Sequence, residues 1–558
     1  MLDLIRHHIA RYAYIAKVAY KAGAIAIPRP SKMVELARSA LQTSSLGPHL
    51  ALMAHAAAHP DKEALIEYGE HGVSRFTYGE LDATINRLAG ALVTRGLAKG
   101  GRVAMMLPNG KEYLIAQQAL ARIGGTAVQL GYRSKAGEIA YILDNADPVA
   151  TIVHASFLPT MRDARSQSGK GGALIVVDGE NVTDAGTTER AIDWDRALAA
   201  SSPEMPKLER GGDGGGVIVY TSGTTGKPKG ANRSWKSTGF DSVADLIDRV
   251  GMRADDRHLV VCPLYHSAAP AFVAIMMGLG ATIVLMNHFD PEGALDIIAK
   301  ERITCSVMVP TMLIRIANLP PETIAKHDAS SLRWIMSAAA PLTTDAARRF
   351  MDKFGPVQWN FYGATETGLV TIAGPHDHLS RPGTIGVAMR GNEIRLLGDD
   401  GRQVKQGEIG ELYVKNETMI TGYHNNSDAT TDAQKQGLFS VGDLARQDAD
   451  GYYFLESRKH DMVISGGVNI YPREIEDVLA THPAILEAAI VGVPHPEWGE
   501  SLKAFVVLRP GHDLTGDDVI KFARQHLADF KSPRAVSFLP EMPRNPTGKI
   551  LKRELRDL

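Results

Sequence analysis

Hydrophobic and polar positions follow two alternating patterns along the chain. Short apolar runs bounded by turn residues are typical of buried strands, and they alternate with longer stretches whose apolar positions recur at helical spacing. The clearest runs cover residues 173–177, 217–220 and 281–285. This alternation predicts an α/β protein built from layers, with parallel sheets covered by helices.

The first 25 residues predict an amphipathic helix. The apolar stripe consists of Leu2, Ile5, Ile9, Tyr12, Ala16 and Ala19, and the basic residues away from it are Arg6, Arg11, Lys17 and Lys21. Two interpretations stay open: peripheral contact of residues 1–25 with an anionic membrane surface, or docking of the stripe on the protein's own body. Lys17 and Lys21 argue against a cleavable signal because they interrupt any apolar region.

A second apolar stretch, residues 267–287, carries no charge and is nearly long enough to span a bilayer. Pro270, Gly278 and Gly280 divide it, and the β-branched residues that follow favour a strand. The stretch therefore predicts a helix followed by a buried strand, and we reject a membrane span.

The pattern changes after Gly391, where short strand-like pieces are separated by glycine turns. A chain of 558 residues normally divides into domains. We place the main boundary near residues 455–461, which gives a large N-terminal domain of layered α/β subdomains (residues 1–457) and a small C-terminal α+β domain (residues 458–558).

Composition narrows the choice of partner and compartment. The formal net charge is only -2, so no global basic field favours nucleic acid as a partner. Cys262 and Cys305 are far apart in the sequence and form neither a disulfide framework nor a metal motif. A reducing, cytoplasmic setting is expected, with the membrane surface open as a site of peripheral contact.

The strongest chemical signal lies between residues 217 and 230, where a strand leads into a loop rich in glycine and hydroxyl groups. Glycines let the backbone approach an anion, hydroxyls donate hydrogen bonds, and a lysine supplies charge. We expect the loop to bind a polyphosphate. Pro228 follows the lysine, so the loop is not a Walker loop. Its candidate phosphate-binding residues are Thr221, Ser222, Gly223, Thr224, Thr225, Gly226 and Lys227.

Further motifs follow in a fixed order: residues 360–366 (NFYGATE), 440–443 (SVGD), 456–458 (ESR), 465–467 (SGG) and 546–549 (PTGK). Together with the loop they resemble the adenylate-forming superfamily of acyl-CoA synthetases, luciferases and peptide-synthetase adenylation domains, and most closely its fatty-acid acyl-CoA synthetases. The resemblance implies that ATP and a carboxylic acid give an acyl adenylate and pyrophosphate. Coenzyme A then gives acyl-CoA and AMP. It also implies that the small C-terminal domain is mobile.

The resemblance assigns roles around the nucleotide. Glu366 is the catalytic residue expected to hold Mg²⁺, which proteins bind through one or two carboxylates and phosphate oxygens. Thr365 is expected to hold phosphate and Tyr362 to stack on adenine. Asp443 is expected to accept hydrogen bonds from the ribose hydroxyls. The remaining candidates around the nucleotide are Ala339, Asn360, Gly363 and Arg458.

Lys549 resembles the catalytic lysine of the family. Its ammonium would stabilise negative charge that builds on the α-phosphate during attack by the carboxylate. For the thiol step, Gly466 and Gly467 are expected to line the path of coenzyme A, with a tight turn as the alternative. His460 stands at the hinge position, where the family usually has Asp or Lys, so we hypothesise that thioester formation depends on its protonation near neutral pH.

The substrate is suggested by residues 263–270, which lack the acidic residue that pairs with an amino group in amino-acid-activating relatives. His266 resembles the residue that borders the carboxylate site. Small residues around it predict a roomy apolar pocket, so a fatty or bulky hydrophobic acid is favoured over acetate. Two alternatives remain: an enzyme that loads a carrier protein, and a catalytically silent nucleotide-binding protein at a membrane.

Overall fold

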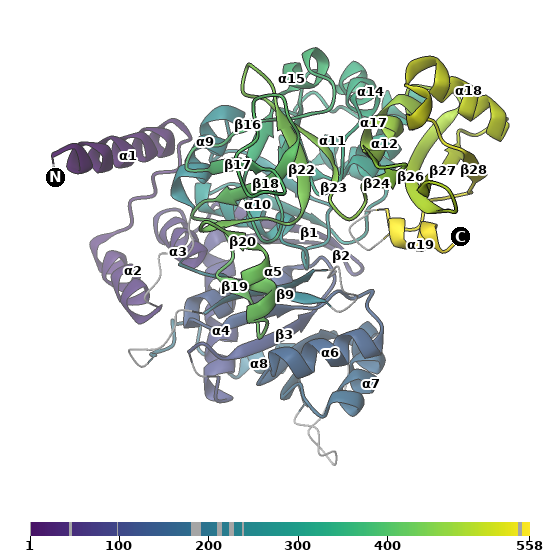
Figure 1. The fold of residues 1–558 in the computed structure, drawn as a ribbon. Helices are drawn as coiled ribbons and strands as arrows, with labels where there is room; N and C mark the ends of the chain where they lie inside the picture. The colour runs from purple at the N-terminus through teal and green to yellow at the C-terminus, as the bar shows by residue number, and fades with distance from the viewer. Residues whose placement is uncertain are drawn as a thin grey trace.

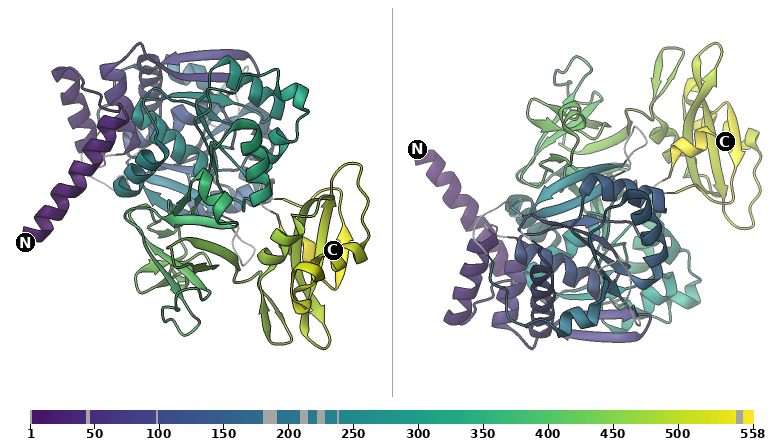
Figure 2. Two further views of the ribbon diagram at one scale, coloured as in Figure 1. Left: turned by 90° about the horizontal axis from the view of Figure 1, so that it is seen from above. Right: turned by 90° about the horizontal axis from the view of Figure 1, so that it is seen from below.

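The structure is a computed structural model that describes residues 2–43, 47–97, 99–179, 191–208, 215–221, 228–236, 239–544 and 550–558. A large body built on two sheets carries the N-terminal helices on one side and a small C-terminal domain on another (Figures 1 and 2). The α/β class expected from the sequence is confirmed, as is the pairing of a large N-terminal part with a small C-terminal one.

The first sheet has the strand order β2-β1-β11-β10-β12-β13-β14-β15-β16-β23-β22-β18-β21-β20, with β17 beside β18. It is parallel from β1 to β14 and antiparallel beyond. Its parallel strands are β1 (Glu63–Gly69), β11 (Thr282–Met286), β10 (Arg257–Val260), β12 (Cys305–Met308), β13 (Trp334–Ser337) and β14 (Gln358–Tyr362), flanked by β2 (Gly72–Thr77). The antiparallel part contains β15 (Thr371–Ala373), β16 (Thr384–Ala388), β17 (Glu393–Leu397), β18 (Gly410–Lys415), β20 (Gln434–Lys435), β21 (Leu438–Phe439), β22 (Asp443–Gln447) and β23 (Tyr453–Arg458).

The second sheet has the order β19-β9-β8-β4-β3-β5-β6-β7 and is parallel except at β9 and β19. Its strands are β3 (Arg102–Met106), β4 (Thr126–Gln129), β5 (Ala150–His154), β6 (Ala173–Val177), β7 (Ala191–Asp193), β8 (Gly216–Thr221), β9 (Lys229–Ser234) and β19 (Gly422–Tyr423). The three apolar runs of the sequence coincide with β6, β8 and β11, because strands buried on both faces need no polar alternation.

Helices lie between the two sheets and on their outer faces. One core cluster joins α4 (Tyr78–Thr94), α5 (Lys111–Ile123) and α10 (Ala268–Leu279) to residues of both sheets. The first sheet is covered outside by α11 (Pro291–Lys300), α12 (Pro310–Ala317) and α14 (Thr344–Phe354), and the second by α6 (Ala136–Ala146) and α7 (Leu158–Ser168). Shorter helices are α8 (Trp194–Ala199), α13 (Pro321–Ile324), α15 (Pro375–Ser380) and α16 (Ser427–Asp432).

The C-terminal domain has its own sheet, with the order β25-β24-β27-β26 and β28 beside β27. Its strands are β24 (Val463–Ser465), β25 (Val468–Ile470), β26 (Ile485–His495), β27 (Gly499–Leu508) and β28 (Ala535–Phe538), and its helices are α17 (Pro472–Leu479), α18 (Gly516–His526) and α19 (Lys552–Arg556). Two hydrophobic clusters of its own fill this domain. The sheet begins five residues after β23 ends, close to the boundary placed from the sequence.

The N-terminal helix α1 (Leu2–Lys21) docks on α9 (Phe240–Val250) by a different face from the stripe seen in the sequence. Val18 and Ala22 are buried, whereas Ile9 and Tyr12 of the stripe are 64% and 60% exposed. Figure 1 shows α1 extending from the body. The alternative in which this stripe docks on the protein is therefore wrong for Ile9 and Tyr12. Helices α2 (Pro30–Thr43) and α3 (Pro48–Ala58) follow.

Ion pairs hold the docked face of α1. Arg11 lies 2.9 Å from Asp241 and 2.5 Å from Glu417, and Lys21 lies 2.7 Å from Asp248. Two of the basic residues assigned to a membrane surface are thus used within the molecule. In the described part of the chain no helix has the length and apolar character needed to cross a membrane. Residues 267–287 form α10 and β11, as their glycines and proline predict.

Candidate active site

Glu366 lies in the turn after β14, where side chains from three distant segments meet. The Thr221 hydroxyl, at the end of β8, donates to Glu366 Oε1 at 3.0 Å, and the Tyr423 hydroxyl donates to the same oxygen at 3.2 Å. Glu366 is only 7% exposed. Among the described residues none donates to Oε2, so one carboxylate oxygen stays available to a cation. This oxygen-rich set fits Mg²⁺, which prefers oxygen ligands.

Two basic residues of the second sheet lie near this carboxylate, one at its backbone and one beside Tyr423. Arg233 on β9 donates to the Thr365 carbonyl oxygen at 2.7 Å, and burial lowers its pKa to about 10, against the opposing effect of Glu366. It therefore stays charged at neutral pH. Lys229 Nζ lies 5.2 Å from the centre of the Tyr423 ring. The Tyr423 pKa is raised by burial and by Glu366, which keeps its hydroxyl protonated as a donor.

A second cluster lies where β14 and β22 approach. The Tyr362 hydroxyl donates to Asp443 Oδ2 at 2.7 Å, and Arg458 Nε lies 3.2 Å from Asp443 Oδ1. Burial raises the Tyr362 pKa, with Asp443 as a further cause, so the phenol remains a donor. The structure thus brings together three residues that the sequence assigned to one nucleotide, although 81 positions separate Tyr362 from Asp443.

Backbone constraints shape the loops around these clusters. Ala339, after β13, has φ 69°, a left-handed conformation that costs a non-glycine residue about 1–2 kcal/mol. Such strain is often kept at functional sites. A Cβ on Gly363 would lie 1.9 Å from the Gly368 carbonyl oxygen, so this glycine is required for the turn itself. Ala339, Asn360 and Gly363 all line the cleft described next.

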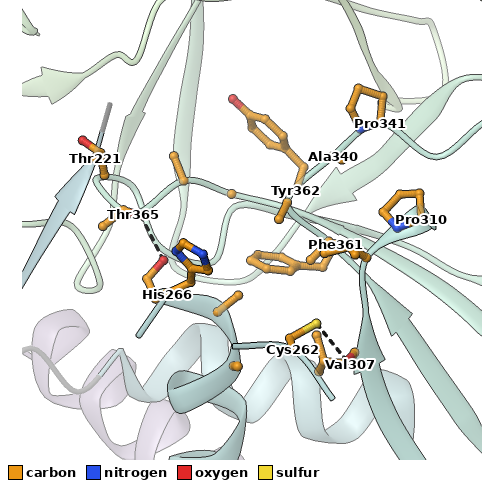
Figure 3. A pocket seen from close by; sticks show the side chains of 18 of the residues that line it. Thr221, Cys262, His266, Val307, Pro310, Ala340, Pro341, Phe361, Tyr362 and Thr365 are labelled. Atoms are coloured by element: carbon orange, nitrogen blue, oxygen red, sulfur yellow. Dashed lines mark hydrogen bonds between the residues drawn. The ribbon is translucent and has the colours of Figure 1, made fainter. Parts of the chain in front are cut away.

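One cleft of about 3260 Å³ contains both clusters. Its apolar part lies beside His266, which precedes α10 (Figure 3). The Ser267 hydroxyl lies 3.0 Å from Thr365 Oγ1, which ties this segment to the Glu366 turn. The Cys262 thiol donates to the Val307 carbonyl at 3.4 Å, and burial raises its pKa to about 12. The thiol is therefore neutral and behaves as part of an apolar wall with Phe361 and Pro310.

Two predicted groups lie outside the described residues: the loop residues Ser222, Gly223, Thr224, Thr225, Gly226 and Lys227, and the catalytic candidate Lys549. The residues beside them are described. Thr221 and Pro228, which flank the loop, line the same cleft as Arg544 and Ile550, which flank residues 545–549. The ends of both segments therefore open on one cleft.

The hinge candidate His460 also lines the cleft, 3.8 Å from Asp461, and its carbonyl accepts from Arg556. Gly466 and Gly467 lie elsewhere, as the two-residue turn of the β24–β25 hairpin, with φ values of 57° and 79°. Such a turn needs left-handed backbone at both central positions, which explains both glycines without a ligand. Their role toward coenzyme A stays a prediction.

Sequence reasoning missed Tyr423 and Arg233. Tyr423 belongs to a strand of two residues, β19, which pairs with β9 from about 190 positions away. Arg233 follows the phosphate loop on β9, but nothing in its sequence context sets it apart from a surface arginine. Only the pairing of β19 with β9 places both beside Glu366.

Comparison with known proteins decides the family. Residues 52–424 match the AMP-binding enzyme family, and residues 474–549 match the AMP-binding enzyme C-terminal domain. The chain belongs to the AMP-binding enzyme family. Like its relatives, this AMP-binding enzyme is an AMP-forming acid–thiol ligase of the acyl-CoA synthetase class, and its substrates are a small-molecule acid, ATP and coenzyme A.

Relatives of this AMP-binding enzyme differ in their acids. A feruloyl-CoA synthase of Amycolatopsis sp is 35% identical over 87% of this chain and 94% of its own length. A long-chain-fatty-acid–CoA ligase of Mycobacterium tuberculosis is 32% identical over 87% of this chain and 93% of its own length. The ATP-bound structure of MatB from Rhodopseudomonas palustris has a TM-score of 0.80 and 30% identity, covering 92% of this chain and 98% of its own.

Proposed function

We propose that this enzyme activates a hydrophobic carboxylic acid, fatty or aromatic, and transfers the acyl group to coenzyme A. The observation that carries the proposal is the buried Glu366, bonded to Thr221 at the start of the phosphate loop and opening on the same cleft as Asp443. The carboxylate attacks the α-phosphorus of ATP, the bond to the β-phosphate oxygen breaks, and pyrophosphate leaves with its electron pair.

In this step Asp443 accepts hydrogen bonds from the ribose, and Tyr362 stacks on adenine. The other residues placed around the nucleotide are Ala339, Asn360, Gly363 and Arg458. The loop 221–227 binds phosphate with Thr365. Lys549 stabilises the negative charge that builds on the α-phosphate, an interaction stronger in the transition state than in the ground state. Mg²⁺ would be held by Glu366, where it would neutralise phosphate charge during transfer.

The second step uses the same site after the C-terminal domain turns about His460. The thiol of coenzyme A, after loss of its proton, attacks the acyl carbon, and the bond to the phosphate oxygen of AMP breaks. Arg544 and Ile550, the described residues on either side of residues 545–549, line the cleft, whereas Gly466 and Gly467 do not. This supports a structure poised for adenylate formation, with the glycine hairpin brought in by rotation.

The hydrophobic character of the acid rests on the wall beside His266. Cys262, Val307 and Phe361 line this part of the cleft, and α10 adds the small residues Ala268 and Ala271. Such a wall offers apolar contact and few hydrogen bonds, which favours an acid without further charges. The aromatic and long-chain acids named for the relatives have this character.

We also propose that residues 1–25 contact an anionic membrane surface. Helix α1 is already anchored by its other face, yet Ile9, Tyr12 and Tyr20 are at least 60% exposed beside Lys17. Apolar side chains next to a basic residue on an exposed helix suit the interface of anionic lipids.

The experiment that tests the enzymatic proposal measures ATP–pyrophosphate exchange with hexanoate, palmitate, ferulate and indoleacetate, followed by release of acyl-CoA. In the Lys549→Ala variant we expect exchange to fall about a hundredfold or more, the cost of about 3 kcal/mol for one preorganised charge. Transfer from preformed acyl adenylate to coenzyme A should persist, because Lys549 is not needed there.

Lys521→Ala is the matched control, since Lys521 is exposed on α18 and should leave exchange unchanged. Wild-type protein that exchanges pyrophosphate with none of these acids would refute the proposal. If Lys549→Ala slowed adenylate formation and thioester formation equally, the proposed specific role of Lys549 in adenylate formation would be wrong.

A further inference from the structure

The acid-binding part of the cleft continues well beyond the reaction centre. The same cleft that contains His266 and Phe361 is lined by residues along one side of α10: Ala268, Ala271, Ala274, Ile275 and Gly278. Ala268 lies next to the segment tied to Thr365, and Gly278 lies near the other end of the helix, where its carbonyl contacts the His55 ring. Ten residues of helix span about 15 Å, the length of an extended chain of about twelve carbons.

The far end of this extension is built by the N-terminal segment. The same cleft is also lined by Val243, Ala244 and Ile247 of α9 and by Ile15, Val18 and Ala19 of α1. Val18 is 3% exposed, so it belongs to the interior, unlike Ile9 on the outer side of the helix. The extension is thus apolar on the α1, α9 and α10 sides.

Helix α1 precedes the part of the chain that matches the family, which begins at residue 52. It is held in place by the ion pairs of Arg11 with Asp241 and Glu417, and of Lys21 with Asp248. An element that precedes the region matched to the family is therefore held where its residues line the cleft that contains the catalytic candidates.

We infer that α1 forms the distal wall of the acid-binding site and sets the length of acid that the enzyme accepts, with Ile15 and Val18 contacting the tail of a long apolar acid. The inference rests on the proposed function and names its substrate class: acids with an unbranched apolar tail long enough to pass along α10. Short or compact acids would occupy only the part beside His266 and Phe361.

The test compares kcat/KM for adenylate formation across saturated acids from six to eighteen carbons. Val18→Trp fills the distal end, so the longest acids should lose at least about tenfold, the value of two or three buried methylene groups, while hexanoate stays unchanged. Ala271→Phe lies nearer the carboxylate of the bound acid, so it should shorten the longest acid that the enzyme still activates efficiently. Tyr20→Trp is the control, because Tyr20 is 78% exposed on α1.

A second measurement needs no variant. Palmitate carrying a terminal diazirine, bound to the wild-type enzyme with ATP and irradiated, should label the peptide that contains Ile15 and Val18. A six-carbon diazirine acid should label residues near His266 and Phe361 instead. Labelling of α1 by neither acid, or a length profile unchanged in Val18→Trp, would overturn the inference while exchange with hexanoate still upheld the proposed function. Failure of every acid to support exchange would overturn both.

Discussion

Glu366 has a simple electrostatic environment: two hydroxyl groups on one carboxylate oxygen and the half-buried guanidinium of Arg233 at the neighbouring Thr365 carbonyl. A carboxylate held in this way loses little freedom when a cation arrives, because its orientation is already fixed. Tyr423 has no charge to offer. It is a positioning residue, and its effect on catalysis should be smaller than that of Glu366.

Glu366→Gln should lower adenylate formation about a hundredfold and raise the Mg²⁺ concentration needed for half-maximal exchange. The fold should persist, because an amide oxygen still accepts from Thr221 and Tyr423. Tyr423→Phe should cost about tenfold, the value of one hydrogen bond to a charged group. Titration of Mg²⁺ against the exchange rate measures both effects.

Glu322→Gln, at an exposed glutamate of α13, is the control and should behave as wild type. An unaltered Mg²⁺ requirement in Glu366→Gln would show that the cation is held elsewhere.

Much of this site was predictable because its residues lie in ordered local motifs. Glu366 and Asp443 are recognisable from the residues around them, and the structure places each in the same cleft. Tyr423 and Arg233 had no such signal, since long-range strand pairing alone brings them to Glu366. The buried runs of the parallel sheets were equally predictable, because strands covered on both faces are continuously apolar.

Helix α1 shows where periodicity is insufficient. Its sequence contains two apolar faces, one with Ile9 and Tyr12 and one with Ile15 and Val18, and spacing alone does not choose between them. Asp241 and Asp248 on α9 form ion pairs with Arg11 and Lys21. These ion pairs orient α1 so that its second face packs against the protein. The remaining face, which carries Ile9 and Tyr12, stays exposed.

The exposed face of α1 should bind anionic vesicles. Replacing Ile9 and Tyr12 together by Asp should reduce the fraction that sediments with phosphatidylglycerol vesicles at least about tenfold, because two apolar contacts are lost and two negative charges are added. Adenylate formation with hexanoate should not change.

Val73→Asp adds a charge at a 52% exposed apolar residue of β2 and serves as the control. Equal sedimentation of wild type and the double variant would contradict a membrane role for this face.

The whole molecule is organised around the junction near residue 458. Arg458 contacts Asp443, and Lys459 lies 3.0 Å from Asp399 and 3.3 Å from Glu411, so the residues just before the C-terminal sheet are tied to the large domain. Arg509 lies 3.7 Å from Asp345 and links the two domains farther out. His460 is the first residue after these anchors, where a change of backbone angle would rotate everything that follows.

His460→Asp should alter the pH dependence of thioester formation between pH 6 and 8, because it replaces the group that changes charge there. The charged neighbours of His460 are Asp461, 3.8 Å from its ring, and Arg556, which donates to its carbonyl oxygen. The measurement is single-turnover transfer from preformed acyl adenylate to coenzyme A as a function of pH, with adenylate formation recorded in parallel. An identical profile in the variant would show that His460 protonation plays no part in the domain movement.

Asp443 connects the nucleotide site to the junction between the two domains. Its carboxylate is shared between Tyr362 inside the site and Arg458 at the pivot. A ribose whose hydroxyls donate to this carboxylate would compete with Arg458 for the same oxygens and weaken the contact between Arg458 and Asp443. The enzyme with bound nucleotide would then differ from the enzyme without it in how freely the C-terminal domain rotates.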